Sequence, residues 1–192
     1  MNDGRLSVRE RNKQETTRRI HNIAATMALK NGLLDTKVEA IAEAAGVSKR
    51  TFFNYFASKE DAVLGVQQPV LRSEVIERFT TRDDDLLTRV VWMFVDVART
   101  VMVADTIKRH KQLRQHFPEL LGRFKASMMQ VEGVVRPAVV SACPKVSDQE
   151  VSIILSVAGA IIRYTYGFDA ELTDASIGKS LKQFKVTLQR SL

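Results

Sequence analysis

The stretch that decides the fold is TKVEAIAEAAGVSKRTFFNYFASKED, residues 36–61. Thr36 and Glu39 have the spacing of a capping box, in which a threonine side chain and a glutamate three residues later cap each other's backbone. This pattern predicts a short helix over about residues 37–45. Gly46 accepts a positive φ at little cost and is expected to end that helix.

A second short helix is expected to follow almost immediately. Ser48 is placed to cap it, and it is expected to run to about Tyr55. Ser58 is a third start signal, which opens a helix to about residue 65. Two short helices joined by a tight glycine turn predict a helix-turn-helix.

The residue types in this segment fit that motif. The side chains expected to face inward are Ile41, Ala42, Ala45, Val47, Phe52 and either Tyr55 or Phe56. The side chains left on the second helix are of the types that bond phosphates and base edges: Lys49, Arg50, Thr51 and Asn54. A short helix with such a face suits the major groove of DNA. A helical hairpin used only for packing is the alternative interpretation.

The aromatic second helix and the Phe56-x-Ser58-Lys59-Glu60 run after it resemble the DNA-binding signature of the TetR family of bacterial transcriptional regulators. The resemblance covers about residues 13–65. It implies a homodimer in which each subunit places its second short helix in one half of a palindromic, double-stranded DNA operator. It also implies a C-terminal helical domain that binds a small-molecule effector.

The resemblance further implies which side chains contact DNA. The expected set is Thr17, Arg18, Thr36, Lys37, Ser48, Lys49, Arg50, Thr51, Asn54, Tyr55 and Lys59. Two positions depart from the family pattern. Arg50 stands where a small residue is usual, and Phe53 stands where a tyrosine usually offers a hydroxyl to a phosphate.

Helical periodicity continues outside residues 36–61. Residues 1–12 are polar and are expected to form a flexible arm, followed by an amphipathic helix from Lys13 to Asn31. Further helices are expected over about 86–104, 118–142 (kinked or broken at Pro137), 148–167 and 174–190. We therefore predict an all-α protein with the arm 1–12, a helix-turn-helix domain 13–65 and a helical effector-binding and dimerisation domain 66–192, dimerising through 148–167 and 174–190.

Composition supports a globular protein with an anionic partner. The 192 residues carry 29 Lys and Arg against 22 Asp and Glu, a formal charge of +7. The single cysteine, Cys143, excludes an internal disulfide, and a structural thiol is favoured over a redox switch. There is no long apolar run and no apolar signal segment at the start, so we expect a soluble, cytoplasmic protein with no membrane role.

An effector pocket is the least determined part of the prediction. Its candidate residues are Trp92, Asp96, Arg99, Met102, Met128, Arg163 and Tyr164. Plain core packing explains the aromatic and methionine side chains equally well. The arginines can also be exposed or paired, with Asp96 and Asp105 as candidate partners.

Other sites are not indicated. His110 and His116 have the wrong spacing for a metal site on one helix face, and His21 is expected on the surface. No catalytic motif is present, so no enzyme activity, cofactor or metal is expected. The predicted function is a sequence-specific, ligand-responsive repressor. The alternatives are a non-specific architectural DNA-binding protein, or a helical enzyme or ligand-binding protein whose hairpin is structural.

Overall fold

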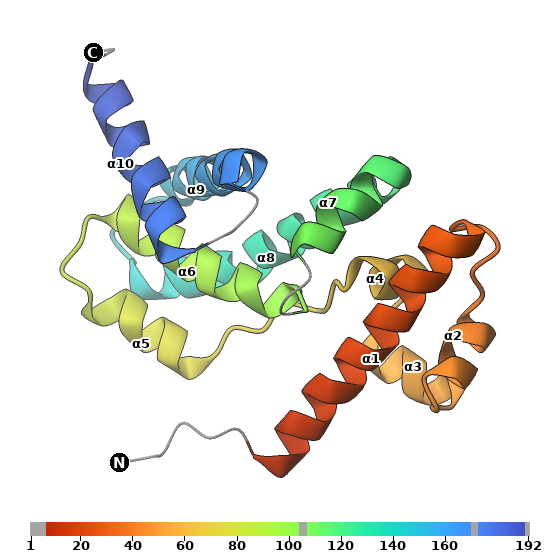
Figure 1. Ribbon diagram of the computed structural model, residues 1–192. Helices are drawn as coiled ribbons and strands as arrows, with labels where there is room; N and C mark the ends of the chain where they lie inside the picture. Colours follow the sequence, from red (N-terminus) through yellow and green to blue (C-terminus); the bar gives the residue numbers. More distant parts are fainter. Residues whose placement is uncertain (1–6, 104–106, 170–172, 191–192) are drawn as a thin grey trace. The chain divides into compact units, whose positions relative to one another are not determined.

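The computed structural model describes residues 7–103, 107–169 and 173–190. Within these ranges the fold is all-α, as predicted, with an isolated antiparallel bridge between Val66 and Met102. The helices are α1 (Val8–Asn31), α2 (Val38–Ala44), α3 (Lys49–Tyr55), α4 (Lys59–Leu64), α5 (Ser73–Thr81), α6 (Leu86–Val101), α7 (Ile107–His116), α8 (Leu120–Ala142), α9 (Asp148–Asp169) and α10 (Asp174–Arg190) (Figure 1). None of these helices is both long and apolar enough to cross a membrane.

The chain divides into two compact units. The first takes the described parts of residues 1–67 and 102–124, and the second takes residues 68–101 and the described parts of 125–192. In the first unit α1 packs against α2, α4 and α7, and α2 packs against α3. The described parts of 102–124 therefore group with the helix-turn-helix region, whereas the sequence analysis placed them with the C-terminal domain.

Helix α1 begins five residues earlier than expected. Ser7 and Glu10 form a capping box: the Ser7 hydroxyl oxygen accepts from the Glu10 N–H at 3.2 Å, and the Glu10 carboxylate accepts from the Ser7 N–H at 2.9 Å. The prediction of a flexible arm over 1–12 is thus wrong for residues 8–12, which are helical, while residues 1–6 lie outside the described ranges. These first turns were missed because they are exposed and carry no apolar stripe.

In the second unit α6 packs against α5 and α9, and α10 packs against α9. Its core is apolar and includes Val90, Val91, Val95, Val97, Val135, Leu155, Ile162 and Ile177. Of the two expected effects of Pro137, a break does not occur, because α8 is continuous from Leu120 to Ala142; a kink there stays a prediction. Proline there removes the bond to the carbonyl of Gly133, but Gly133 is exposed, so water can replace that donor.

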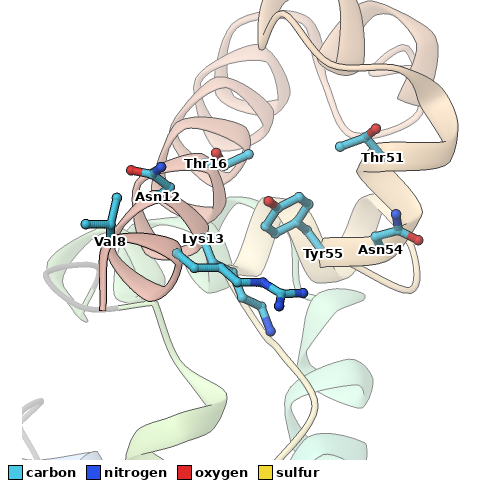
Figure 2. A pocket seen from close by; sticks show the side chains of 8 residues that line it. Val8, Asn12, Lys13, Thr16, Thr51, Asn54 and Tyr55 are labelled. Carbon is cyan, nitrogen blue, oxygen red and sulfur yellow. The ribbon is translucent and has the colours of Figure 1, made fainter. Parts of the chain in front are cut away.

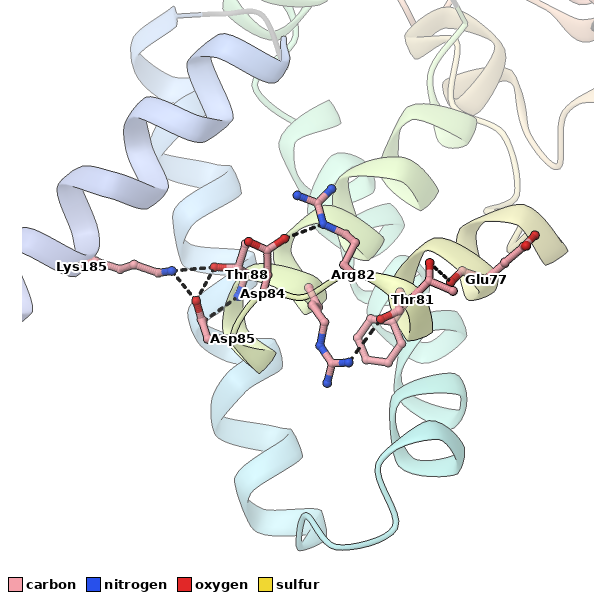
Figure 3. A network of polar contacts seen from close by, with 9 residues as sticks. Glu77, Thr81, Arg82, Asp84, Asp85, Thr88 and Lys185 are labelled. Carbon is pink, nitrogen blue, oxygen red and sulfur yellow. Dashed lines mark hydrogen bonds and ion pairs between the residues drawn. The ribbon is translucent and has the colours of Figure 1, made fainter.

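A polar network ties the start of α6 to α10. Asp85 accepts from the backbone N–H of Thr88 at 3.1 Å and from its hydroxyl at 2.8 Å, and the Lys185 ammonium donates to Asp85 at 2.5 Å (Figure 3). Partial burial raises the pKa of Asp85, but the hydrogen bonds from Lys185 and Thr88 outweigh it and lower the pKa to about 2. The pair links two helices that are far apart in the sequence.

Candidate nucleic-acid interface

The turn between α2 and α3 has the geometry that a helix-turn-helix needs. Gly46 has a φ of 65°, and the N–H of Val47 donates to the carbonyl of Ala42 at 2.9 Å, which closes the end of α2. Ile41, Ala42 and Ala45 are buried, as predicted. Small side chains at the last two of these positions leave room for the helices to pack closely.

The helix starts agree with the sequence in two cases and differ in one. Ser48 accepts from the N–H of Thr51 at 3.0 Å, and Ser58 accepts from the N–H of Asp61 at 3.0 Å, so both predicted caps are confirmed. The capping box predicted for Thr36 is wrong. Its hydroxyl donates backwards to the carbonyl of Gly32 at 2.8 Å, and the N-cap of α2 is Lys37, without a side-chain bond.

Helix α3 is anchored by aromatic side chains. Phe52 and Phe56 are buried with ring centroids 6.2 Å apart, while Tyr55 is only half-buried, so Phe56 is the second anchor. Phe53 stands edge-on to Phe52 with its side chain 47% exposed. The anchors fix α3 and leave its other face open.

The open face of α3 is basic and polar. Lys49, Arg50, Phe53 and Asn54 are exposed. The Lys49 ammonium donates to Glu39 on α2 at 2.5 Å, and this contact lowers the pKa of the Glu39 carboxyl. Arg50 and Asn54 make no polar side-chain contact with any residue in the described ranges. Their donors and acceptors are therefore available to a ligand.

A groove lies between the first turns of α1 and the C-terminal half of α3 (Figure 2). Its volume is about 710 Å³, and it is lined by Val8, Arg9, Asn12, Lys13, Thr16, Thr51, Asn54 and Tyr55. Three of these residues belong to the predicted DNA-binding set. The five on α1 were missed, although the Ser7-x-x-Glu10 spacing could have revealed that the helix starts there.

The two α1 residues predicted to contact DNA, Thr17 and Arg18, do not line the groove. Thr17 is buried, and its hydroxyl donates to the carbonyl of Lys13 at 2.8 Å, which does not favour the predicted contact; the threonine that lines the groove is Thr16. Arg18 is exposed, but it follows Arg9 by about two and a half helical turns and emerges from the opposite side of α1. Thr36 is likewise buried, and its hydroxyl donates to the carbonyl of Gly32, so its side chain is already engaged within the domain.

A comparison with known families decides the nature of this segment. Residues 22–65 match the family described as bacterial regulatory proteins, tetR family. The segment is a TetR-type helix-turn-helix domain. This match supports a DNA-binding transcriptional regulator of the TetR type. No curated protein matches the chain.

At the start of α4, the TetR-type domain uses two charged residues in internal contacts. The Lys59 ammonium donates to the carbonyls of Leu33 at 2.8 Å and Leu34 at 3.3 Å, in the connection between α1 and α2. Asp61 is buried and forms an ion pair with Arg123 of α8, which also donates to the Ser58 hydroxyl at 3.3 Å. Lys59 is therefore held in place beside the turn that precedes α2.

His21 lies in the core of the TetR-type domain, contrary to its predicted surface position. It is fully buried between α1 and α4, where its Nδ1–H donates to the carbonyl of Ala62 at 2.9 Å. Burial lowers the pKa of His21, against the opposing effect of the Ala62 carbonyl, and Arg109 lowers it further. A neutral imidazole thus bridges the two helices.

The structure places Trp92, Asp96 and Arg99 of the predicted effector set on α6. The guanidinium carbon of Arg82 lies over the Trp92 ring, 5.5 Å from the ring centroid. Asp96 pairs with Arg78 at 2.8 Å, and Arg99 pairs with Asp174 at 2.6 Å. Arg99 is therefore ion-paired, which is one of the alternatives that the sequence left open. Asp105, the other candidate partner, lies outside the described residues.

The remaining effector candidates lie on α8, on α9 and just after α6. Met128 is half-buried on α8, and Arg163 and Tyr164 are exposed on α9. Met102 forms the isolated bridge with Val66, and both residues belong to the first compact unit. His116 is exposed, and the described residues contain no group of three or more histidine, cysteine or acidic side chains suited to a metal.

Proposed function

We propose that this protein is a sequence-specific repressor that binds a palindromic operator as a homodimer and responds to a small-molecule effector. The observation that carries the proposal is the open face of α3, which combines Lys49, Arg50 and Asn54 on a helix anchored by buried aromatic residues. Arginine and lysine pair with guanine and asparagine pairs with adenine in the major groove, so this face can distinguish bases.

Phe53 adds an apolar contact to the proposed reading face. Its exposed ring offers no hydrogen bond, so it suits a thymine methyl group or a deoxyribose rather than a phosphate oxygen. The position therefore favours sequence reading over the backbone contact that a tyrosine would make.

The dimer is supported by uncovered apolar side chains on α9 and α10. Ile153 is 57% exposed and Tyr164 is 52% exposed on α9, and Leu188 of α10 is 50% exposed. A second copy of this chain would cover them. Two recognition helices about 34–36 Å apart would then enter successive major grooves on one side of the duplex.

The effector response is supported by the second compact unit. It has its own apolar core and contains helices that the DNA-binding motif does not need for its own packing. An effector that binds one dimer geometry better than another would shift the spacing of the recognition helices and release the operator. The proposal places this regulator in the cytoplasm and gives it no enzymatic step.

The test is selection of duplex DNA from a random pool by the purified protein, followed by titration of the selected sequences at several salt concentrations. A palindromic consensus that is lost on replacing Lys49 and Asn54 by alanine supports the proposal. Binding with a steep salt dependence but no consensus indicates an architectural DNA-binding protein instead. No binding at any salt concentration would contradict both and leave the hairpin a structural element.

A further inference from the structure

The groove between α1 and α3 is a cationic recess built beside the reading face. It lies between the first turns of α1 and the end of α3, and its lining includes Arg9, Lys13, Asn54 and Tyr55 (Figure 2). All of these residues belong to the same compact unit. The groove thus lies entirely within the DNA-binding domain.

The charge in the groove is not neutralised. No acidic side chain lines it, and neither Arg9 nor Lys13 forms an ion pair with any residue in the described ranges. The nearest acid in sequence, Glu10, has its carboxylate bound by the N–H and hydroxyl of Ser7 at 2.9 and 2.7 Å. Lys49, by contrast, already has an anionic partner in Glu39.

The two cations stand on preformed backbone. The capping box at Ser7 starts α1 before Arg9, so Arg9 and Lys13 follow one another by one helical turn on the same face. Asn12 and Thr16 occupy that face as well and add uncharged hydrogen-bonding groups. Donors arranged around an open, positively charged recess suit a phosphodiester.

We propose that this groove binds a DNA backbone phosphate at the margin of each half-site. The proposal rests on the proposed function, because it needs α3 in the major groove to bring the backbone alongside α1. Asn54 and Tyr55 belong to both the groove and α3, so a phosphate held there sets how α3 is oriented against the bases. Arg9 and Lys13 supply affinity and register, while base selection stays with α3.

Two measurable properties follow. A protein that neutralises a phosphate releases counterions, and the logarithm of its binding constant falls with the logarithm of salt concentration by about 0.9 per phosphate. In a dimer, one or two phosphates in each groove make two to four phosphates in all. Arg9 and Lys13 should therefore contribute about 2 to 4 to the slope of the logarithm of the binding constant against the logarithm of salt concentration. The preferred base sequence should not depend on these residues.

The experiment compares the full-length protein with Arg9→Gln, Lys13→Gln and the double variant on a duplex obtained by selection. Arg11→Gln is the matched control, because Arg11 is also exposed near the start of α1 but does not line the groove. We expect the double variant to bind at least about tenfold more weakly at 0.15 M salt, with a shallower slope and the same consensus. Arg11→Gln should change both quantities much less.

Ethylation interference identifies the phosphates themselves. The unmodified protein should lose binding when particular phosphates at the margin of each half-site are ethylated, and the double variant should no longer be sensitive to them. This readout separates a DNA phosphate from a free anion in the groove. The phosphate assignment is overturned if the double variant keeps the consensus but has the same interference pattern and salt slope as Arg11→Gln. It is also overturned if the double variant selects a different consensus. In both cases the proposed function stands. Absence of any consensus for the unmodified protein would overturn both.

Discussion

Lys49 on the recognition helix is engaged before DNA arrives. Its ammonium lies 2.5 Å from Glu39, and both side chains are largely exposed. Binding a phosphate or a base through Lys49 must break or share this contact. We expect Glu39→Gln to strengthen operator binding by a few-fold, because it frees Lys49 and removes a negative charge near the DNA.

Glu43→Gln separates these two causes. Glu43 is exposed on the same helix α2 and has no contact with Lys49. It therefore changes the charge of the domain equally without releasing the lysine. Equilibrium titration of both variants on one duplex measures the difference, and equal effects would show that the Lys49–Glu39 pair does not restrain binding.

The burial of individual polar side chains could not be predicted from the sequence. Thr17, His21 and Thr36 are polar, and from sequence they were assigned to DNA or to the surface. In the structure each is buried, and its hydroxyl or ring nitrogen donates to a backbone carbonyl. Which polar side chains become buried depends on what packs over them, and His21 needs Ala62, forty-one positions away. No local pattern carries that information.

At the scale of elements, α4 ends on a glycine that two constraints require. Gly65 has a φ of 67°, and a Cβ atom added there would lie 2.9 Å from Nδ1 of the buried His21 ring. We expect Gly65→Ala to lower the free energy of unfolding by more than about 1 kcal/mol, from backbone strain and the displaced ring together. Chemical denaturation measures this loss.

Gly133→Ala is the matched control for that substitution. Gly133 lies inside α8, and an added Cβ atom would meet nothing within 4 Å. The same chemical change there should stabilise the protein by about 0.5–1 kcal/mol, because alanine favours a helix interior. If Gly65→Ala were also neutral or stabilising, the tight approach of His21 to α4 would be contradicted.

The Asp85–Lys185 contact predicts a pH dependence of stability. The pKa of Asp85 is held at about 2 in the folded protein, below its ordinary value of 3.8. The contact therefore contributes fully above pH 4 and is lost as the pH falls toward 2. Because the carboxylate is 55% exposed, its contribution is about 1 kcal/mol.

Asp85→Asn tests this contribution while keeping a residue that can cap α6. We expect it to lower the free energy of unfolding by about 1 kcal/mol at pH 6 and by progressively less between pH 4 and pH 3. Denaturant titrations of both proteins across this pH range measure the difference. A difference that stays constant from pH 6 to pH 3 would show that the charge of Asp85 does not stabilise the fold.

Elements with a cap and a periodic apolar face were predictable. The Ser48, Ser58 and Ser147 caps are present, the last as a full capping box with Glu150, and α9 and α10 begin where expected. Helices α5 and α7 were not predicted. Helix α7 is mostly polar with Leu113 buried, so it has no stripe to detect. Its place in the fold comes from packing against α1.

At the scale of the whole molecule, the open polar face of α3 was predictable and the groove beside it was not. The polar residues of α3 follow from the short motif around Gly46, because caps and buried aromatic side chains fix its orientation. The groove also needs α1, whose early start depends on the capping box at Ser7. The membership of residues 102–124 in the DNA-binding unit is a tertiary fact, set by contacts such as Asp61 with Arg123.

Binding of a palindromic operator by the proposed homodimer depends on how the two copies are held together, and the proposed interface is tested at Ile153. This side chain is 57% exposed on α9, so in a monomer a charge there costs little. In a dimer through α9 and α10 the same charge would be buried without a partner, at a cost of several kcal/mol. We therefore expect Ile153→Glu to fold normally but to sediment as a monomer and to lose cooperative binding to the full palindrome.

Ile76→Glu is the control, since Ile76 is an exposed apolar residue of α5 in the same compact unit. It should leave the molecular mass in solution and operator binding unchanged. Analytical ultracentrifugation and DNA titration of both variants, with circular dichroism to confirm helicity, measure the outcome. A dimeric Ile153→Glu protein would move the interface away from this face of α9. A monomer that still bound the full palindrome at unchanged affinity would show that dimerisation in solution is not what joins the two half-sites, because each subunit would then be binding its half-site independently.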